Sequence, residues 1–177
     1  MSEARHTFDE AVAAYVVRQW PKTNTGALGR TFLQKLLYFA RAKGVPLTLE
    51  YDIHYYGPFC ADLYDIVDWL RADDIIVDSG QANISSFSPG PNMDSVLSEH
   101  KLQIAQVSST LDMIISWARG RTARDMELYA TTSFIRNSSR NRDNDNRTID
   151  EVRSIKGSKF GKDEIIDAIR WLSQRGL

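Results

Sequence analysis

The N-terminal third of the chain alternates between stretches with helical spacing and short stretches of turn residues. In the first stretch, apolar residues recur at intervals of three and four: Phe8, Val12, Tyr15, Val16 and Trp20. This spacing predicts a helix. Thr7 suits its N-cap, with Glu10 three residues later completing a capping box. Pro21 is expected to end the helix, since proline lacks the N–H that a helix needs.

The next two helices are predicted on either side of a short strand. Residues 30–43 carry a wide apolar face, which indicates a well-buried helix, and Gly44 suits the position just after it. Residues 50–56 alternate weakly and are rich in tyrosine and isoleucine, which favours a strand. Gly57 and Pro58 break this strand. Because proline suits the first turn of a helix, a third helix is expected from about Pro58 to Leu70.

A hairpin is predicted after the third helix. Its strands are residues 75–77 and 84–87, joined by the turn sequence SGQAN. The order helix, helix, strand, helix, hairpin is typical of a winged helix-turn-helix. We therefore expect a mainly α fold with a small β-hairpin, in which residues 1–90 form a winged-helix-like core.

The C-terminal half is predicted to be helical. A linker, SPGPN, precedes a long helix at 94–119, and Thr122 with Asp125 opens the next one. Further helices are expected at 149–155 and from about 158 or 162 to the C-terminus. The segment 136–147 has no apolar residue, which predicts an exposed and mobile loop. Residues 94–177 would then be the helical C-terminal part of a single domain, 1–177.

Composition and charge narrow the class of protein. The chain has 177 residues, is 42% hydrophobic and carries a formal net charge of −1, which fits one globular domain without a bulk basic excess. Its one cysteine, Cys60, excludes an intramolecular disulfide. The polar N-terminus does not resemble a signal peptide, and no apolar run reaches the roughly 18 residues of a membrane span. We expect a cytoplasmic protein that does not contact a membrane.

The segment that follows the first helix carries a resemblance to a known group. Its residues are LQKLLYFA at 33–40, Gly44, Pro46-Leu47, YGPF at 56–59 and Leu63-Tyr64. This order resembles the YwgA-like and Panacea (SocA-like antitoxin) group of bacterial proteins. Residues 122–129 and 160–177 are also similar to the YwgA-like members, so the resemblance covers about two thirds of the chain. Residues 50–54 depart from the antitoxin pattern, where a tryptophan-containing strand is often seen.

The resemblance implies a function that depends on binding. It implies an antitoxin-like or adapter role in which the chain captures another protein, a toxin or another effector, in a bacterial toxin–antitoxin or defence context. It implies no catalytic residues and no cofactor. We therefore expect a protein that is not an enzyme.

The residues themselves show little catalytic or metal chemistry. The three histidines, His6, His54 and His100, are scattered without the spacing of metal ligands, so no metal site is expected. Cys60 follows Pro58 at the predicted helix start, where a thiol pKa is lowered, and His54 is close in sequence. A lone cysteine is more often a small buried hydrophobe than a nucleophile.

Two surfaces are candidates for binding, and each has a plain structural alternative. The first is a partner-binding surface: Tyr55, Tyr56, Phe59, Asp62, Asp65 and Asp68. Its carboxylates repel phosphate and suit a basic partner, although a solvated acidic helix face and a simple turn at YYGP would also account for them.

The second surface is basic and would serve a winged-helix nucleic-acid-binding regulator. Its residues are Arg119, Arg121, Arg124, Arg136, Arg140 and Arg142. The predicted wing, SGQANISS, contains no basic residue, which counts against this alternative.

Overall fold

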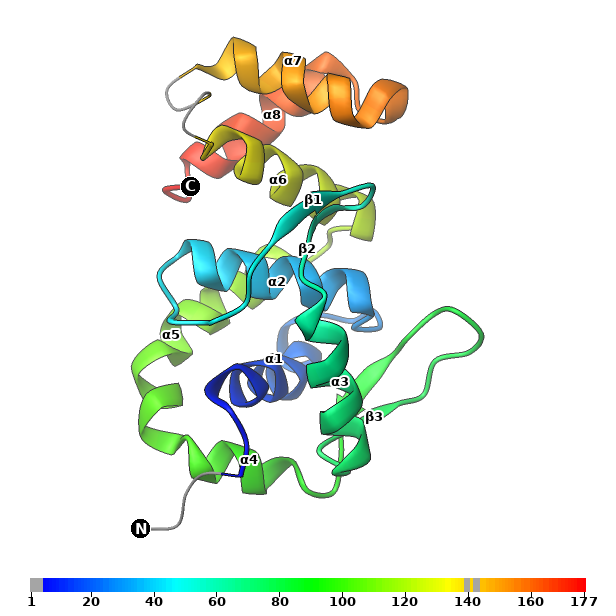
Figure 1. The fold of residues 1–177 in the computed structure, drawn as a ribbon, viewed down its shortest axis with the longest axis vertical. Helices are drawn as coiled ribbons and strands as arrows, with labels where there is room; N and C mark the ends of the chain where they lie inside the picture. The colour runs from blue at the N-terminus through cyan, green and yellow to red at the C-terminus, as the bar shows by residue number, and fades with distance from the viewer. Residues whose placement is uncertain (1–4, 139–140, 142–143) are drawn as a thin grey trace. The chain divides into compact units, whose positions relative to one another are not determined.

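The computed structural model describes residues 5–138, 141 and 144–177. Within these residues the fold is mainly α, with eight α-helices and two separate two-stranded antiparallel hairpins (Figure 1). The predicted fold class is confirmed. The chain forms two compact units: Met1–Glu50 with Cys60–Arg121, and Tyr51–Phe59 with Thr122–Leu177. The predicted single domain, divided near residues 90–94, stays a prediction.

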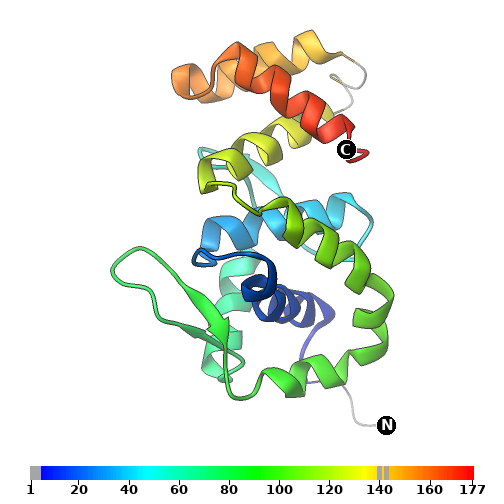
Figure 2. The same ribbon diagram turned by 180° about the vertical axis from the view of Figure 1, so that it is seen from behind.

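The first unit is built around one buried helix. Its elements are α1 (Phe8–Thr23), α2 (Arg30–Ala42), α3 (Asp62–Ala72), β3 (Ile76–Asp78), β4 (Phe87–Pro89), α4 (Met93–Glu99) and α5 (Lys101–Trp117). Helix α1 packs against α2, α3, α4, α5 and β4 and lies in the middle of this unit (Figures 1 and 2). Its stretch from Ala11 to Ala14 is completely buried, because small side chains let neighbouring helices approach closely. Helices α1–α3 and the β3–β4 hairpin follow the predicted order, but the strand predicted between α2 and α3 belongs to a separate hairpin in the second unit.

Helix α1 begins where the sequence predicts but ends later. Thr7 and Glu10 form the expected capping box. Pro21 does not end the helix, which continues to Thr23. Because Pro21 lies in the last turn, the missing N–H removes a single backbone hydrogen bond, and Asn24 still donates to the carbonyl of Trp20 at 3.0 Å.

The long helix predicted at 94–119 is two helices. It breaks at His100, whose backbone leaves the helical region with φ −111° and ψ 21°. Nothing in the local spacing signals this break. Its cause is a set of contacts between residues 99–100 and the N-terminal segment, described below.

The returning strand of the β3–β4 hairpin begins later than predicted. Ile76 pairs with Pro89 and Asp78 with Phe87, so the returning strand begins at Phe87 instead of Ile84. The reason is burial: Phe87 is in the core, and its N–H donates to the carbonyl of Leu28 at 2.9 Å. Ile84 is exposed on the loop, which extends away from the helices of this unit (Figures 1 and 2).

The second unit packs one hairpin and two helices around α6. Its elements are β1 (Asp52–His54), β2 (Gly57–Phe59), α6 (Ala123–Arg136), α7 (Asp145–Lys156), a 3₁₀ turn (Gly157–Lys159) and α8 (Lys162–Ser173). Helix α6 contacts β2, α7 and α8. It starts with the predicted capping box of Thr122 and Asp125.

Two predictions about this part of the chain need correction. Gly57 and Pro58 do not start a helix, because they form β2, paired with β1, and α3 begins only at Asp62. The predicted loop 136–147 is also shorter, since α6 reaches Arg136 and α7 begins at Asp145. Asn141 in this connection is buried and donates to the carbonyl of Ile135 at 3.2 Å. The mobility of the segment stays a prediction.

Across the described parts of the chain, every helix is too short or too polar to cross a membrane.

Candidate functional site

The turn between β1 and β2 carries two exposed tyrosines. Tyr55 and Tyr56 are 73% and 63% exposed, and their rings meet edge to face with centroids 4.9 Å apart. Phe59 lies further along β2 and is half buried, with its ring 4.9 Å from that of His54. The turn therefore displays large amphipathic side chains of the type that commonly anchor protein interfaces.

A buried ion pair on α6 and α7 contacts the backbone of this turn. Lys156, at the end of α7, donates to the backbone carbonyl of Tyr55 and to Glu127 Oε1 at 3.0 Å. The side chains of Lys156 and Glu127 are only 1% and 5% exposed. Burial, partly offset by Glu127, lowers the pKa of Lys156 below its ordinary value of 10.5. The turn is thus held by a cation on α7 and its counter-ion on α6.

Lys159 adds a second cation at the same place. Its Nζ lies 2.8 Å from both carboxylate oxygens of Glu127. The same ammonium is 5.5 Å and 5.2 Å from the ring centroids of Tyr55 and Tyr56. These are cation–π distances, so Lys159 restrains the two rings as well as pairing with Glu127.

Gly57 explains why the sequence has YYGP at this turn. Its φ is +87°, a conformation that disfavours any side chain. A Cβ atom here would lie 2.6 Å from Oγ1 of Thr131 on α6. Gly57 is therefore required by both the turn and the close packing of β2 on α6, which gives YYGP a structural role.

The acidic residues of the predicted partner-binding surface lie on α3 in the first unit. Asp62, Asp65 and Asp68 are all exposed. Asp68 is 3.4 Å from Arg71 and 4.0 Å from Arg30, so part of its charge is balanced within the unit. The aromatic residues Tyr55, Tyr56 and Phe59 belong to the second unit, so the predicted surface is divided between the two units.

Three residues of the predicted basic set bind groups of this chain. Arg119 donates to the carbonyl of Thr23 at 3.2 Å. Arg124 binds Glu164 at 2.6 Å, and Arg136 donates to Ser173 Oγ at 2.9 Å. Of the other three residues, Arg121 is the last residue of the first unit, and Arg140 and Arg142 lie outside the described residues.

Cys60 is buried, as expected for a lone cysteine, but the pKa of its thiol shifts in the direction opposite to the prediction. It precedes α3 and is 1% exposed. Burial raises the pKa of its thiol, although the backbone N–H groups of Leu63 and Asp62 oppose this effect. The backbone of Cys60 is bound on both sides by Gln34, whose Oε1 accepts at 3.1 Å and whose Nε2 donates at 2.8 Å. The predicted lowering of this pKa is wrong, because desolvation outweighs the helix N-terminus.

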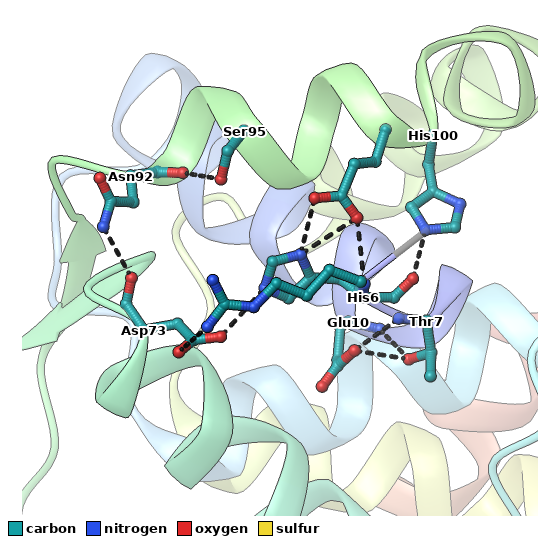
Figure 3. Close-up of polar contacts among 9 residues, drawn as sticks. His6, Thr7, Glu10, Asp73, Asn92, Ser95 and His100 are labelled. Carbon is teal, nitrogen blue, oxygen red and sulfur yellow. Dashed lines mark hydrogen bonds and ion pairs between the residues drawn. The ribbon is translucent and has the colours of Figure 1, made fainter. Parts of the chain in front are cut away.

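A polar cluster that sequence reasoning missed joins the N-terminal segment to the rest of the first unit (Figure 3). His6 is buried, and its Nε2 lies 3.1 Å from Asp73 while its Nδ1 lies 3.0 Å from Glu99. His100 Nε2 contacts the carbonyl of His6 at 2.7 Å. Although partial burial raises it, the N–H and ring of His6 hold the pKa of Glu99 below its usual range.

This cluster accounts for the helix break at His100. At the break, Glu99 and His100 both contact His6, the residue that precedes the N-cap of α1. In the described residues no group of three or more His, Cys, Asp or Glu side chains is arranged to hold a metal ion.

Comparison with known proteins gives no family. No model of a protein family matches the chain, and no curated protein is significantly similar to it. The resemblance to the YwgA-like and Panacea group rests on the residues quoted above.

Proposed function

We propose that this chain is a non-catalytic regulator that binds another protein, with an antitoxin-like or adapter role. It would act by masking: the exposed tyrosines of the β1–β2 turn contact the partner and cover a surface that the partner needs. The resemblance to the YwgA-like and Panacea group supports this class of function.

One observation carries the proposal. Tyr55 and Tyr56 are exposed, yet their turn is fixed by the buried Lys156–Glu127 pair and by Gly57 against α6. Exposed aromatic side chains on a rigid turn lose little conformational entropy on binding. Such a turn is suited to anchoring a protein partner.

The alternative, a nucleic-acid-binding regulator, has weaker support. It needs several arginines free to neutralise phosphates. Arg119, Arg124 and Arg136 instead bind carbonyl, carboxylate or hydroxyl groups of this chain.

A pull-down from the native host tests the proposal. The tagged full chain is incubated with nuclease-treated lysate, and retained proteins are identified by mass spectrometry. We expect one stoichiometric partner that is lost with Tyr55→Ala and with Tyr56→Ala. Ile84→Ala is the matched control, because Ile84 is 75% exposed on the loop between β3 and β4; it should keep the partner.

Two results would contradict the proposal. One is the absence of any stoichiometric protein, with nucleic acid recovered once nuclease is omitted. The other is a partner that tolerates both tyrosine substitutions in folded protein.

A further inference from the structure

Helix α3 presents an exposed face that the packing of its own unit does not explain. Leu63, Val67 and Leu70 point into the core. Asp62, Asp65 and Trp69 are spaced at i, i+3 and i+7, so they share the opposite side of the helix. We call these three residues the α3 face.

Trp69 is the unusual member of this face. Its side chain is 66% exposed, whereas Trp20, Trp117 and Trp171 are at most 8% exposed. An exposed tryptophan leaves a large apolar surface in water, and tryptophan is one of the residue types enriched among binding hot spots.

The two carboxylates of the face have no counter-ion within the described residues. No salt bridge links Asp62 or Asp65 to any residue that the structure describes, whereas Asp68 pairs with Arg71 and Arg30. Carboxylates in the first turn of a helix are stabilised by its dipole, which accounts for their presence at this end. That effect gives no reason for an indole two turns further along the helix.

We propose that the α3 face docks a basic segment of the protein partner, so this inference rests on the proposed function. An arginine or lysine of that segment lies over the Trp69 indole, and its charge is balanced by Asp65 and Asp62. The spacing permits this, because side chains four residues apart on a helix lie about 6 Å apart. One cation can therefore contact the indole and the Asp65 carboxylate together.

The chain already contains the same kind of contact. The guanidinium of Arg30 lies 4.9 Å from the ring centroid of Tyr64 on α3, and that of Arg175 lies 3.9 Å from Trp171. A cation over an indole is the strongest of the cation–π pairs with a side chain. Phosphate groups are disfavoured here, since both carboxylates would repel them.

The test uses a defined probe and the full chain. The probe is a fluorescein-labelled alanine-based peptide with four arginines at i, i+4 spacing, and its control has four glutamines instead. Fluorescence anisotropy at low salt gives the Kd. We expect Trp69→Ala and Asp65→Asn each to weaken binding by about fivefold, the equivalent of roughly 1 kcal/mol. The peptide should also shield tryptophan emission from acrylamide in the wild type but not in Trp69→Ala.

Asp68→Asn is the matched control. It removes the same charge from the same helix, but at a carboxylate that is already paired with arginine. Its Kd should rise less than that of Asp65→Asn, because Asp68 lies about 100° around the helix from Trp69 and affects the peptide only through the overall charge. Equal weakening by Asp68→Asn and Asp65→Asn would reduce the effect to general charge attraction and refute the proposal, as would a Trp69→Ala protein that binds normally.

The two proposals fail separately. A native partner lost with Tyr56→Ala, together with a peptide that ignores Trp69, refutes the α3 proposal and keeps the proposed function. The opposite pair of results is also possible: peptide binding is weakened by Trp69→Ala, but the pull-down retains no partner that is sensitive to Tyr55 or Tyr56. That pair refutes the role of the turn and keeps the α3 face.

Discussion

Replacing Glu127 with leucine should destabilise the second unit more than replacing Lys156 with methionine. The asymmetry follows from the contacts. Without Glu127, the buried ammonium of Lys156 keeps only the carbonyls of Tyr55 and His54. Without Lys156, the Glu127 carboxylate still binds Lys159 at 2.8 Å. Glu127→Leu therefore leaves the buried ammonium of Lys156 without a counter-ion, whereas Lys156→Met leaves the Glu127 carboxylate paired with Lys159.

The magnitude has a physical ceiling. Breaking a buried ion pair by removing one partner typically costs about 3–5 kcal/mol. Lys156 can escape a larger cost by losing its proton. From its ordinary pKa of 10.5, deprotonation at pH 7 costs about 4.8 kcal/mol, at about 1.36 kcal/mol per pH unit. Lys156→Met should cost about 1–3 kcal/mol, the usual range for leaving buried carbonyls without a donor.

The same reasoning predicts a pH dependence. The folded-state pKa of Lys156 is lowered, so the unfolded chain holds the proton more tightly than the folded one. Its unfavourable contribution is complete below the folded pKa and is relieved as the pH rises towards 10.5. The penalty of Glu127→Leu should therefore shrink with rising pH, by up to about 1.4 kcal/mol per unit.

Urea unfolding followed by circular dichroism, at pH 7, 8 and 9, measures these free energies. Hydrogen exchange read by mass spectrometry shows which unit opens. Glu127→Gln, which keeps the shape of the side chain, serves if the leucine variant does not fold. The double variant Glu127→Leu/Lys156→Met should recover much of the loss, because it leaves no buried charge.

Two results would refute this reasoning. One is a Lys156→Met penalty as large as that of Glu127→Leu. The other is a Glu127→Leu penalty that does not change with pH.

Three further predictions follow from single residues. Gly57→Ala should destabilise the chain by at least about 1–3 kcal/mol through its positive φ, as measured by urea unfolding. Adding Thr131→Ala should restore only the part of the loss that comes from the clash with Thr131. A Gly57→Ala protein of unchanged stability would contradict the packing of β2 on α6. Burial and the hydrogen bond to Asp112 raise the pKa of Tyr15 to about 12. Because the folded chain then keeps a proton that the unfolded chain loses, the free energy of unfolding should fall between pH 10 and 12. Tyr15→Phe should remove the share of this fall that Tyr15 causes, and an identical fall in the variant would show that Tyr15 is not its source. Cys60 should react with a disulfide reagent only after urea is added, because its thiol is buried with a raised pKa, and rapid reaction of the native protein would contradict this.

Local sequence signals predicted what depends on neighbouring residues. The capping boxes at Thr7 and Thr122 were readable because both partners lie within four residues. The break at His100 was not readable, because the residue that His100 contacts there, His6, lies 94 positions away in the sequence. The spacing of apolar residues therefore predicts the faces of helices but not the long-range contacts at which a helix breaks.

The candidate site shows the same limit. Tyr55 and Tyr56 could be selected from the sequence, because tyrosines beside Gly-Pro indicate an exposed turn. The support beneath them could not, because Lys156 lies about a hundred positions further along the chain. Gly57 followed by proline also suits a helix start, and only the packing of β2 against α6 decides for a strand.

The hairpin Tyr51–Phe59 is an insertion in the first unit that completes the second. The chain leaves the first unit after Glu50, returns at Cys60 and crosses again after Arg121. A fragment starting at Thr122 would therefore lack β2, against which α6 packs. During synthesis the hairpin emerges before its partner helix, with residues 60–121 made in between. The second unit can close only after nearly the whole chain exists, which adds a late, long-range step to folding.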